Sequence, residues 1–227
     1  GVEPQSETVW RQSEKYRIPK LAFVNKMDRA GADFEAVLES MRSRLNARPV
    51  ALQIPIGSGS DFSGVIDLLR MERLVFDQES QGAQYERLPL EEEEAAMAEP
   101  WRERLVETLA EHDDGLLEAY LAGEELPVER LEDVIGTATR ELRLVPVYAG
   151  SALRNVGVQP LLDAVCAFLP SPLEAHPVRG VHPQDRHEIV VRPAPEAPLA
   201  ALVFKVSMET GRKLVFLRVY AGRMDAG

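Results

Sequence analysis

The sequence has little of what marks secreted or membrane-embedded proteins. Its 227 residues contain one cysteine, Cys166, so no disulfide can form within the chain. No run of about 18 apolar residues is present, which excludes a transmembrane helix from this sequence. The first residues, Gly1-Val2-Glu3-Pro4, lack the basic and apolar stretches of a signal peptide. We therefore expect a cytoplasmic protein that makes no contact with a membrane.

Basic residues are fewer than acidic ones, 26 against 37, and the acidic excess is concentrated in one segment. Between Glu72 and Asp133 there are 20 acidic and 5 basic residues, a net charge of −15, whereas the whole chain carries −11. Such a block repels nucleic acid phosphates, so any partner of this segment should be basic. The alternative interpretation is a solvated face of a helical segment that has no partner.

Hydrophobic patterning predicts parts of an α/β domain on both sides of this acidic segment. Residues 5–16 read as a helix, 21–24 as a strand buried on both faces, and 34–45 as a helix capped by Asp33. A second buried strand at 144–149 and a helix at 161–168 repeat this order. The order of helix, strand, polar loop and helix indicates a parallel sheet.

The rest of the chain breaks this order. Short strands at 49–57, 64–68 and 71–76, followed by helices at 90–112, 114–121 and 127–142, predict an α+β insert. Seven of the 16 prolines lie between Pro170 and Pro198, which indicates an irregular linker. Beyond it, 199–206 and 214–220 read as strands joined by a turn at 209–212. Two strands are too few for a stable domain, so we expect a truncated β domain here.

The sequence Asn25-Lys26-Met27-Asp28 follows the first buried strand, where open α/β sheets bind ligands. Guanine presents two adjacent donors, N1–H and N2–H₂, and a carboxylate at Asp28 can accept both. Asn25 can contact the base and tie the loop together, while the stem of Lys26 can cover the face of the base. The alternative is an ordinary polar loop with a capping aspartate.

A second loop, Gly150-Ser151-Ala152-Leu153, follows the other buried strand. The N–H of Ala152 can donate to guanine O6, and the Ser151 hydroxyl can hold the Asp28 carboxylate. Alone this short sequence carries little information. It matters because it is the second of two polar loops that each follow a buried strand.

The order of these loops resembles the G domain of translational GTPases, and several runs of residues are similar to elongation factor G. These runs are spread along nearly the whole chain: Pro4–Gln12, Phe23–Arg29, Gly157–Gln159, Leu162–Val165, Leu169–Pro172, Phe204–Val206 and Arg218–Tyr220.

The resemblance implies a P-loop GTPase-type parallel sheet with an α+β insert, followed by the first strands of a β-barrel domain. It divides the chain into G domain (1–47 and 143–172), acidic G-prime insert (48–142), linker (173–198) and start of domain II (199–227). The residues that it implies for GTP or GDP binding come from both loops: Asn25, Lys26, Asp28, Ser151, Ala152 and Leu153. It implies the ribosome as partner, and the basic C-terminal domain of the ribosomal stalk protein as a partner of acidic residues around Glu91–Glu94, Glu99 and Glu103.

The phosphate-binding motif G-x-x-x-x-G-K-[ST] does not occur; Gly59 and Gly64 have its glycine spacing, but Val65 stands where the lysine is required. We expect that motif and the magnesium-holding residues to lie upstream. The chain alone should be monomeric, should not hydrolyse GTP and should bind it weakly.

Two alternatives remain open. The turn around Met208–Lys213 is shorter than in elongation factor G, which suggests a paralogue acting in translocation, recycling or another role. Within the same class, the alternative is a release-factor or ribosome-protection type GTPase. A different class is a non-catalytic interaction module that binds a basic protein through its acidic insert.

Three other features have ordinary interpretations. His176, His182 and His187 lie in the proline-rich segment without nearby cysteine or regular spacing, so we predict no metal site. Cys166 should lie in the core of its helix, and Trp101 should anchor a charged helix to its neighbour.

Overall fold

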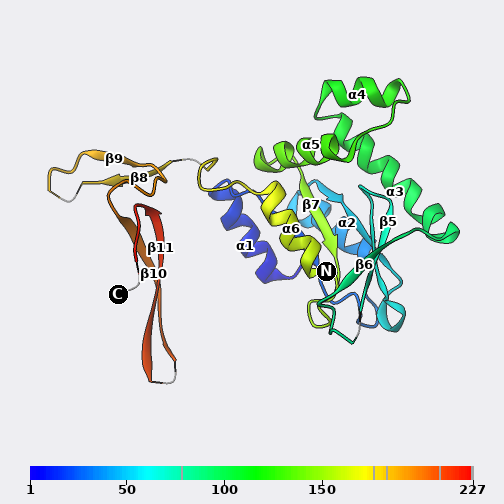
Figure 1. Ribbon diagram of the computed structural model, residues 1–227, viewed down its shortest axis with the longest axis horizontal. Helices are drawn as coiled ribbons and strands as arrows, with labels where there is room; N and C mark the ends of the chain where they lie inside the picture. Colours follow the sequence, from blue (N-terminus) through cyan, green and yellow to red (C-terminus); the bar gives the residue numbers. More distant parts are fainter. Residues whose placement is uncertain (78, 176, 183, 210, 226–227) are drawn as a thin grey trace. The chain divides into compact units, whose positions relative to one another are not determined.

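A computed structural model describes residues 1–227 with the exception of 78, 176, 183, 210 and 226–227 (Figure 1). The chain forms two compact units, Gly1–Leu169 and Pro170–Gly227. Within the described ranges, no helix has the length and apolar character needed to cross a membrane.

A three-stranded parallel sheet with the order β1-β7-β2 forms the centre of the first unit. Its strands are β1 (Ala22–Val24), β7 (Val145–Ala149) and β2 (Pro49–Ala51). Every residue of β7 is buried, because this strand has a neighbour on each edge and helices over its faces. The continuous apolar run at 145–149 is the sequence signal of that position.

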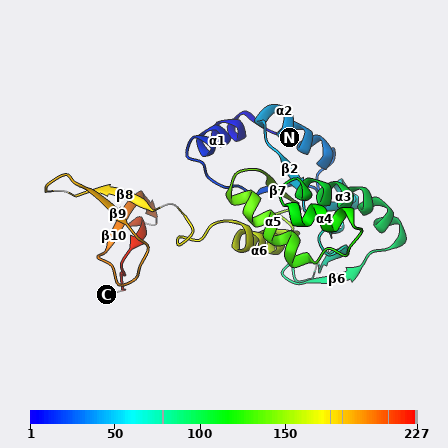
Figure 2. The ribbon, with the colours of Figure 1, turned by 90° about the horizontal axis from the view of Figure 1, so that it is seen from above.

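Helices cover both faces of this sheet. Figure 2 shows α1 (Pro4–Lys15) and α2 (Phe34–Leu45) on one side, with α5 (Val128–Arg140) and α6 (Val158–Phe168) on the other. The first turn of α2 is capped by Asp33, whose Oδ1 accepts the N–H of Ala36 at 2.9 Å. These layers confirm the predicted α/β class.

An antiparallel sheet and two further helices lie between β2 and α5 in the sequence. The sheet has the order β3-β4-β5-β6, and a short 3₁₀ helix, η1 (Gly59–Asp61), separates its first two strands. The bounds of these elements are β3 (Gln53–Ile56), β4 (Gly64–Asp67), β5 (Glu72–Phe76), β6 (Tyr85–Pro89), α3 (Glu92–Ala110) and α4 (Asp114–Leu121).

The structure differs from the sequence prediction in this segment. The strand expected at 49–57 is two strands, because β2 pairs with β7 in the parallel sheet whereas β3 pairs with β4. Leu52 joins the two sheets, since its N–H donates to Val147 O and its carbonyl accepts from Leu68 N, both at 3.0 Å. Residues 49–51 therefore pair with the parallel sheet, although the insert was expected to start at 48. The strand β6 was also not predicted, because most of its residues are exposed.

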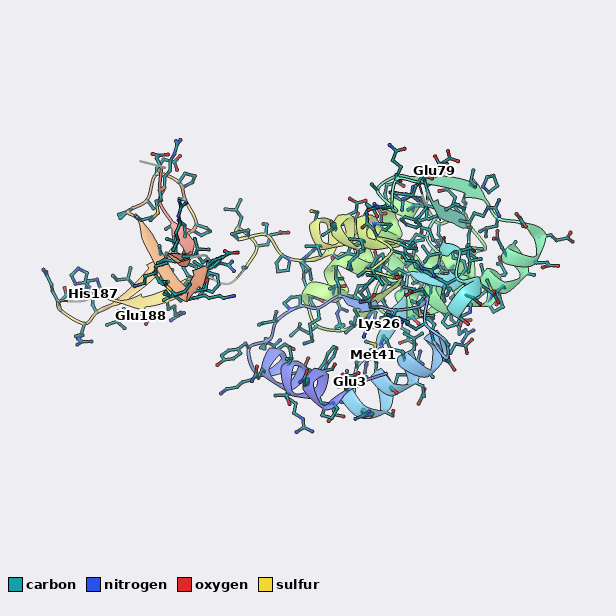
Figure 3. The ribbon with its side chains drawn as sticks, turned by 90° about the horizontal axis from the view of Figure 1, so that it is seen from below. Glu3, Lys26, Met41, Glu79, His187 and Glu188 are labelled. Carbon is teal, nitrogen blue, oxygen red and sulfur yellow. The ribbon has the colours of Figure 1, made fainter. Side chains whose placement is uncertain are left out.

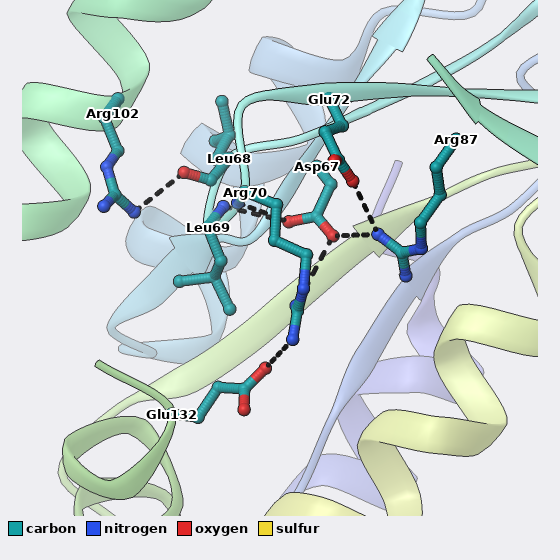
Figure 4. A network of polar contacts seen from close by, with 8 residues as sticks. All are labelled: Asp67, Leu68, Leu69, Arg70, Glu72, Arg87, Arg102 and Glu132. Carbon is teal, nitrogen blue, oxygen red and sulfur yellow. Dashed lines mark hydrogen bonds and ion pairs between the residues drawn. The ribbon is translucent and has the colours of Figure 1, made fainter. Parts of the chain in front are cut away.

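Buried Asp67 organises the turn after β4 (Figure 4). Its Oδ1 accepts the N–H of Leu69 at 2.9 Å and of Arg70 at 3.2 Å, while Oδ2 lies 3.1 Å from the Arg87 guanidinium. Arg70 continues the network to Glu132 of α5 at 2.8 Å. These bonds tie the antiparallel sheet to a helix that also contacts the parallel sheet.

Two side chains singled out in the sequence have different outcomes. The Trp101 ring lies 5.9 Å from the Phe34 ring, so it anchors α3 to α2 as predicted. Cys166 is exposed, and its predicted core position is wrong. The reason is that α6 buries Pro160, Ala164 and Phe168, which leaves Cys166 on its outer face.

The second unit consists of two antiparallel hairpins. They are formed by β8 (Val178–Val181) with β9 (Glu188–Val191), and by β10 (Ala200–Glu209) with β11 (Arg212–Ala221). The expected irregular linker at 173–198 thus contains a hairpin, because Pro177 and Pro193 lie just outside its strands and remove no ladder bond. Adjacent residues Val203 and Phe204 are both exposed, so β10 presents apolar side chains on both faces.

Candidate functional site

Two polar loops meet at one edge of the parallel sheet. Residues 25–28 follow β1 and residues 150–153 follow β7, and both strands end at this edge because they are parallel neighbours. The N–H of Met27 donates to Gly150 O at 3.1 Å, which extends the contact between the strands into the loops. The side chain of Met27 is buried and fixes the first loop to the core.

Asn25 joins the two loops through its side chain. Its Oδ1 accepts the N–H of Lys26 at 2.7 Å and the N–H of Ala152 at 2.9 Å. The first bond favours a tight turn at Lys26, whose φ of 65° lies in the left-handed region. The second bond fixes the backbone of the loop after β7 relative to the loop after β1.

Asp28 is held beside the second loop. Its side chain is 8% exposed, and the Nε of Arg154 lies 3.6 Å from its Oδ2. A hydrogen bond from the Ser151 hydroxyl is the main cause that lowers the Asp28 pKa below its ordinary value of 3.8. Burial acts in the opposite direction, and the charges of Arg154 and Arg29 lower the pKa further. Asp28 is therefore ionised at neutral pH and offers carboxylate oxygens as acceptors.

Glycines allow the second loop to close. Ser151 and Val156 exchange backbone hydrogen bonds of 3.0 Å, which bring the chain back beside β7. A Cβ at Gly150 would lie 2.2 Å from Val156 O, and one at Gly157 would lie 2.4 Å from Ala149 O. Gly157 also has φ of +79°, a conformation that other residues rarely adopt. The loop geometry thus depends on both glycines.

The structure brings together four of the six predicted site residues: Asn25, Asp28, Ser151 and Ala152. The expected contact between Ser151 and Asp28 is present, whereas the N–H of Ala152, expected to serve guanine O6, donates here to Asn25. Lys26 is exposed on its loop (Figure 3). Leu153 is 82% exposed and lines a hollow with Phe62 and Phe76.

Sequence reasoning missed Arg154, the charged neighbour of Asp28. Its position in the second loop, three residues after Ser151, was visible in the sequence. Only the pairing of β1 with β7 shows that this arginine faces a carboxylate 126 positions earlier in the chain.

Comparisons with known proteins agree with this arrangement. Residues 1–171 match the family described as the elongation factor Tu GTP binding domain. The whole chain is 48% identical to elongation factor G 2 of Syntrophus aciditrophicus (strain SB), of which it covers 34%. It is also 48% identical, over 230 aligned residues, to elongation factor G of Salinibacter ruber (strain DSM 13855 / M31), of which it covers 33%.

A crystal structure of a protein from Thermus thermophilus has the same fold, with a TM-score of 0.74 and 30% sequence identity. The match covers 99% of this chain and 30% of that one. The chain therefore spans about a third of the length of the relatives that it matches. It belongs to the family of the elongation factor Tu GTP binding domain.

Proposed function

We propose that this chain forms the base-recognising half of a guanine-nucleotide site in a translational GTPase of the elongation factor G type. The observation that carries the proposal is the bond between Asn25 and Ala152, which unites two loops 127 residues apart at the carboxyl edge of a parallel sheet. The membership of residues 1–171 in a GTP-binding family supports it.

The side chains at this edge match the hydrogen-bonding groups of guanine. The ionised Asp28 carboxylate accepts from N1–H and N2–H₂ of the base, an arrangement that adenine cannot provide. Asn25, whose Oδ1 holds the N–H of Ala152, offers its side-chain NH₂ group to the base, while Lys26 and Leu153, both exposed, cover the faces of the base. Because Asp28 is 8% exposed, the half-exposed Arg154 has to turn aside when the base binds.

Phosphate binding, magnesium binding and GTP hydrolysis belong, in this proposal, to other segments of a longer protein. The motif G-x-x-x-x-G-K-[ST], which cradles phosphates and holds magnesium, is absent from these 227 residues. The relatives, about three times as long, are named elongation factors G. We assign the longer protein a cytoplasmic role on the ribosome, with translocation as the first candidate reaction and recycling as the second.

A nucleoside monophosphate, which lacks the β- and γ-phosphates, tests the proposal on the chain itself. GMP should shift the backbone amide signals of residues 25–28 and 151–153 in NMR spectra, with a dissociation constant on the order of millimolar, since base contacts supply only a few kcal/mol. AMP should cause no comparable shifts. Asp28→Asn should weaken the binding of GMP and favour the binding of XMP, because xanthine replaces one donor by an acceptor.

The control is Asp33→Asn, which changes a carboxylate that caps α2 and lies outside the two loops. This variant should respond to GMP as the unchanged chain does. Equal responses to GMP and AMP, or an unaltered preference in Asp28→Asn, would remove guanine recognition from these loops.

A second candidate function rests on the exposed acidic face of α3. Glu91 and Glu94 have structural roles, since they form a capping box and both approach Arg73. In contrast, several exposed glutamates form no ion pair within the described part of the chain: Glu92, Glu93, Glu99 and Glu103. We propose that this face binds a basic protein, with the C-terminal domain of the ribosomal stalk protein as the first candidate.

Reversing these charges tests the acidic face. Glu92→Lys combined with Glu99→Lys should weaken binding of the stalk domain at least tenfold, roughly the loss of two ion pairs of about 1 kcal/mol each. Glu118→Lys on α4 is the matched control, because this glutamate is also exposed. Equal binding by both variants would contradict the assignment.

A further inference from the structure

The hairpin of β8 and β9 places two imidazoles and a carboxylate around one point. Metal-ligand atoms of His182, Asp185 and His187 all lie within 4.8 Å of one another. The Nδ1 of His182 is 2.7 Å from Asp185 Oδ1, and the Nδ1 of His187 is 2.6 Å from the same oxygen. All three residues belong to the second unit, whereas the loops after β1 and β7 belong to the first.

The backbone of the hairpin fixes this arrangement. Val181 pairs with Glu188 at the end of the ladder, so residues 182 and 187 are opposite one another at the start of the turn. The N–H of His182 donates to His187 O at 2.9 Å, and the two rings stack with centroids 4.9 Å apart. Asp185 comes from the turn itself. The spacing His-x-x-Asp-x-His becomes a cluster only because the chain reverses here.

The contacts inside the cluster leave one nitrogen unsatisfied. The Nδ1 of His182 is shielded from solvent, yet its short contact with Asp185 lacks the alignment of a hydrogen bond. A single carboxylate oxygen thus faces two imidazole nitrogens, one of which has no hydrogen-bond partner within the described residues. A cation held by all three groups satisfies both nitrogens and the carboxylate together.

We propose that His182, Asp185 and His187 bind a divalent transition-metal ion, with Zn²⁺ as the best match. Two imidazole nitrogens and one carboxylate oxygen suit Zn²⁺, whereas Mg²⁺ and Ca²⁺ prefer oxygen ligands throughout. Three protein ligands leave the fourth tetrahedral position to water, and the exposure of Asp185 and His187 gives solvent access.

Two features bear on how tightly the ion is held. The rings are 17° from parallel, so they have to turn until both planes point at the ion. The side chains of His182 and His187 are 34% and 59% exposed, which leaves room for that rotation. Glu188, next to His187 in the hairpin (Figure 3), pairs with Arg179 at 2.8 Å and is therefore not proposed as a ligand. The site is therefore an exposed three-ligand site on a hairpin.

Metal titration of the 227-residue chain, prepared without a polyhistidine tag, tests the proposal. Calorimetry with Zn²⁺ should show one saturable site, and Co²⁺ should give the visible absorption of a tetrahedral complex that Zn²⁺ then displaces. His187→Ala and Asp185→Asn should each weaken Zn²⁺ by at least about tenfold, since loss of even an outer-shell partner costs that much. Mg²⁺ should not compete.

Two control variants distinguish this site from nonspecific metal binding. Glu188→Gln changes a neighbouring carboxylate, and His112→Gln removes a histidine that follows α3 in the first unit; both should leave the affinity for Zn²⁺ unchanged. Circular dichroism verifies that each variant is folded. In NMR spectra, Zn²⁺ should shift the ring-nitrogen signals of His182 and His187 and leave those of His112 unchanged. Absence of saturable binding, or equal affinity in all variants, would overturn the proposal.

Discussion

The side-chain carbonyl of Asn25 accepts a hydrogen bond of 2.9 Å from the N–H of Ala152 and joins two loops that are 127 residues apart. The Ser151 hydroxyl makes a second link by bonding the Asp28 carboxylate. Both links cross between the ends of β1 and β7. The relative position of the loops therefore depends on the sheet and on these two side chains.

Asn25→Ala should loosen the second loop without unfolding the chain. A net hydrogen bond is worth about 1 kcal/mol, so hydrogen exchange at the Ala152 amide should accelerate by up to about tenfold. Exchange measured by NMR provides the test. Leu153→Ala is the matched control, because this side chain is 82% exposed and its truncation breaks no bond between the loops. Unchanged protection of Ala152 in Asn25→Ala would show that the side-chain bond is dispensable.

Ser151→Ala should raise the pKa of Asp28, because the Ser151 hydroxyl bond is the largest cause of its lowered value. Arg154→Gln should raise this pKa by less, since the charge of Arg154 is a smaller contribution and its side chain is half exposed. A carbon-13 NMR titration of the Asp28 carboxyl measures both shifts. The opposite order would mean that the ion pair, and not the hydroxyl, controls this carboxylate.

The hydrogen bond from the Ser151 hydroxyl to the Asp28 carboxylate also makes the free energy of unfolding depend on pH. The Asp28 pKa is depressed in the folded chain, so its contribution to the free energy of unfolding is complete above the unfolded value of about 3.8. That contribution is lost as the pH falls through the lower, folded pKa. The free energy of unfolding that Ser151→Ala loses relative to the unchanged chain should therefore become smaller as the pH falls. Urea unfolding at neutral pH and in acid checks this, and a constant deficit would exclude the linkage.

Gly157→Ala should destabilise the chain more than Gly31→Ala, although both glycines have φ of +79°. At Gly31 nothing lies within 4 Å of an added Cβ, so only backbone strain of about 1 kcal/mol is expected. At Gly157 the Cβ also meets Ala149 O at 2.4 Å, which should bring the loss to roughly 3 kcal/mol. Chemical denaturation gives the difference. Equal losses would mean that the loop shifts freely to accept the methyl group.

Asp67→Ala should destabilise the insert by about 2 kcal/mol or more, because it leaves the N–H groups of Leu69 and Arg70 without their acceptor. It also removes one partner of Arg87, which keeps its 3.4 Å contact with Glu72. Asp61→Ala is the control, since the side chain of this exposed aspartate accepts, among the described residues, only from the neighbouring Ser60 hydroxyl. Thermal unfolding compares the two variants, and similar midpoints would contradict a structural role for the Asp67 network.

The candidate site was largely visible in the sequence because its residues are adjacent to apolar runs. The runs at 21–24 and 144–149 mark strands that are buried between helices, and polar residues directly after such strands lie at the ligand-binding edge of a sheet. The chemical identities of Asn25, Asp28 and Ser151 then indicated guanine.

Other features could not be predicted because they depend on which segments become neighbours. The apolar stretch at 49–57 does not show that its first residues pair with β7 and the following ones with β4. Likewise, the apolar residues around Cys166 do not show which face of α6 meets the sheet. The group formed by His182, Asp185 and His187 requires the reversal of the chain between β8 and β9.

The sequence by itself determined the α/β class, the two polar loops and the acidic character of the insert, since these follow from local hydrophobic order and residue type. The tertiary structure decided that Asn25 meets Ala152, that Arg154 faces Asp28, and that two histidines converge on Asp185. The physical reason is that strand pairing and chain reversal bring distant residues into contact, and hydrogen bonds and ion pairs act only over a few ångströms.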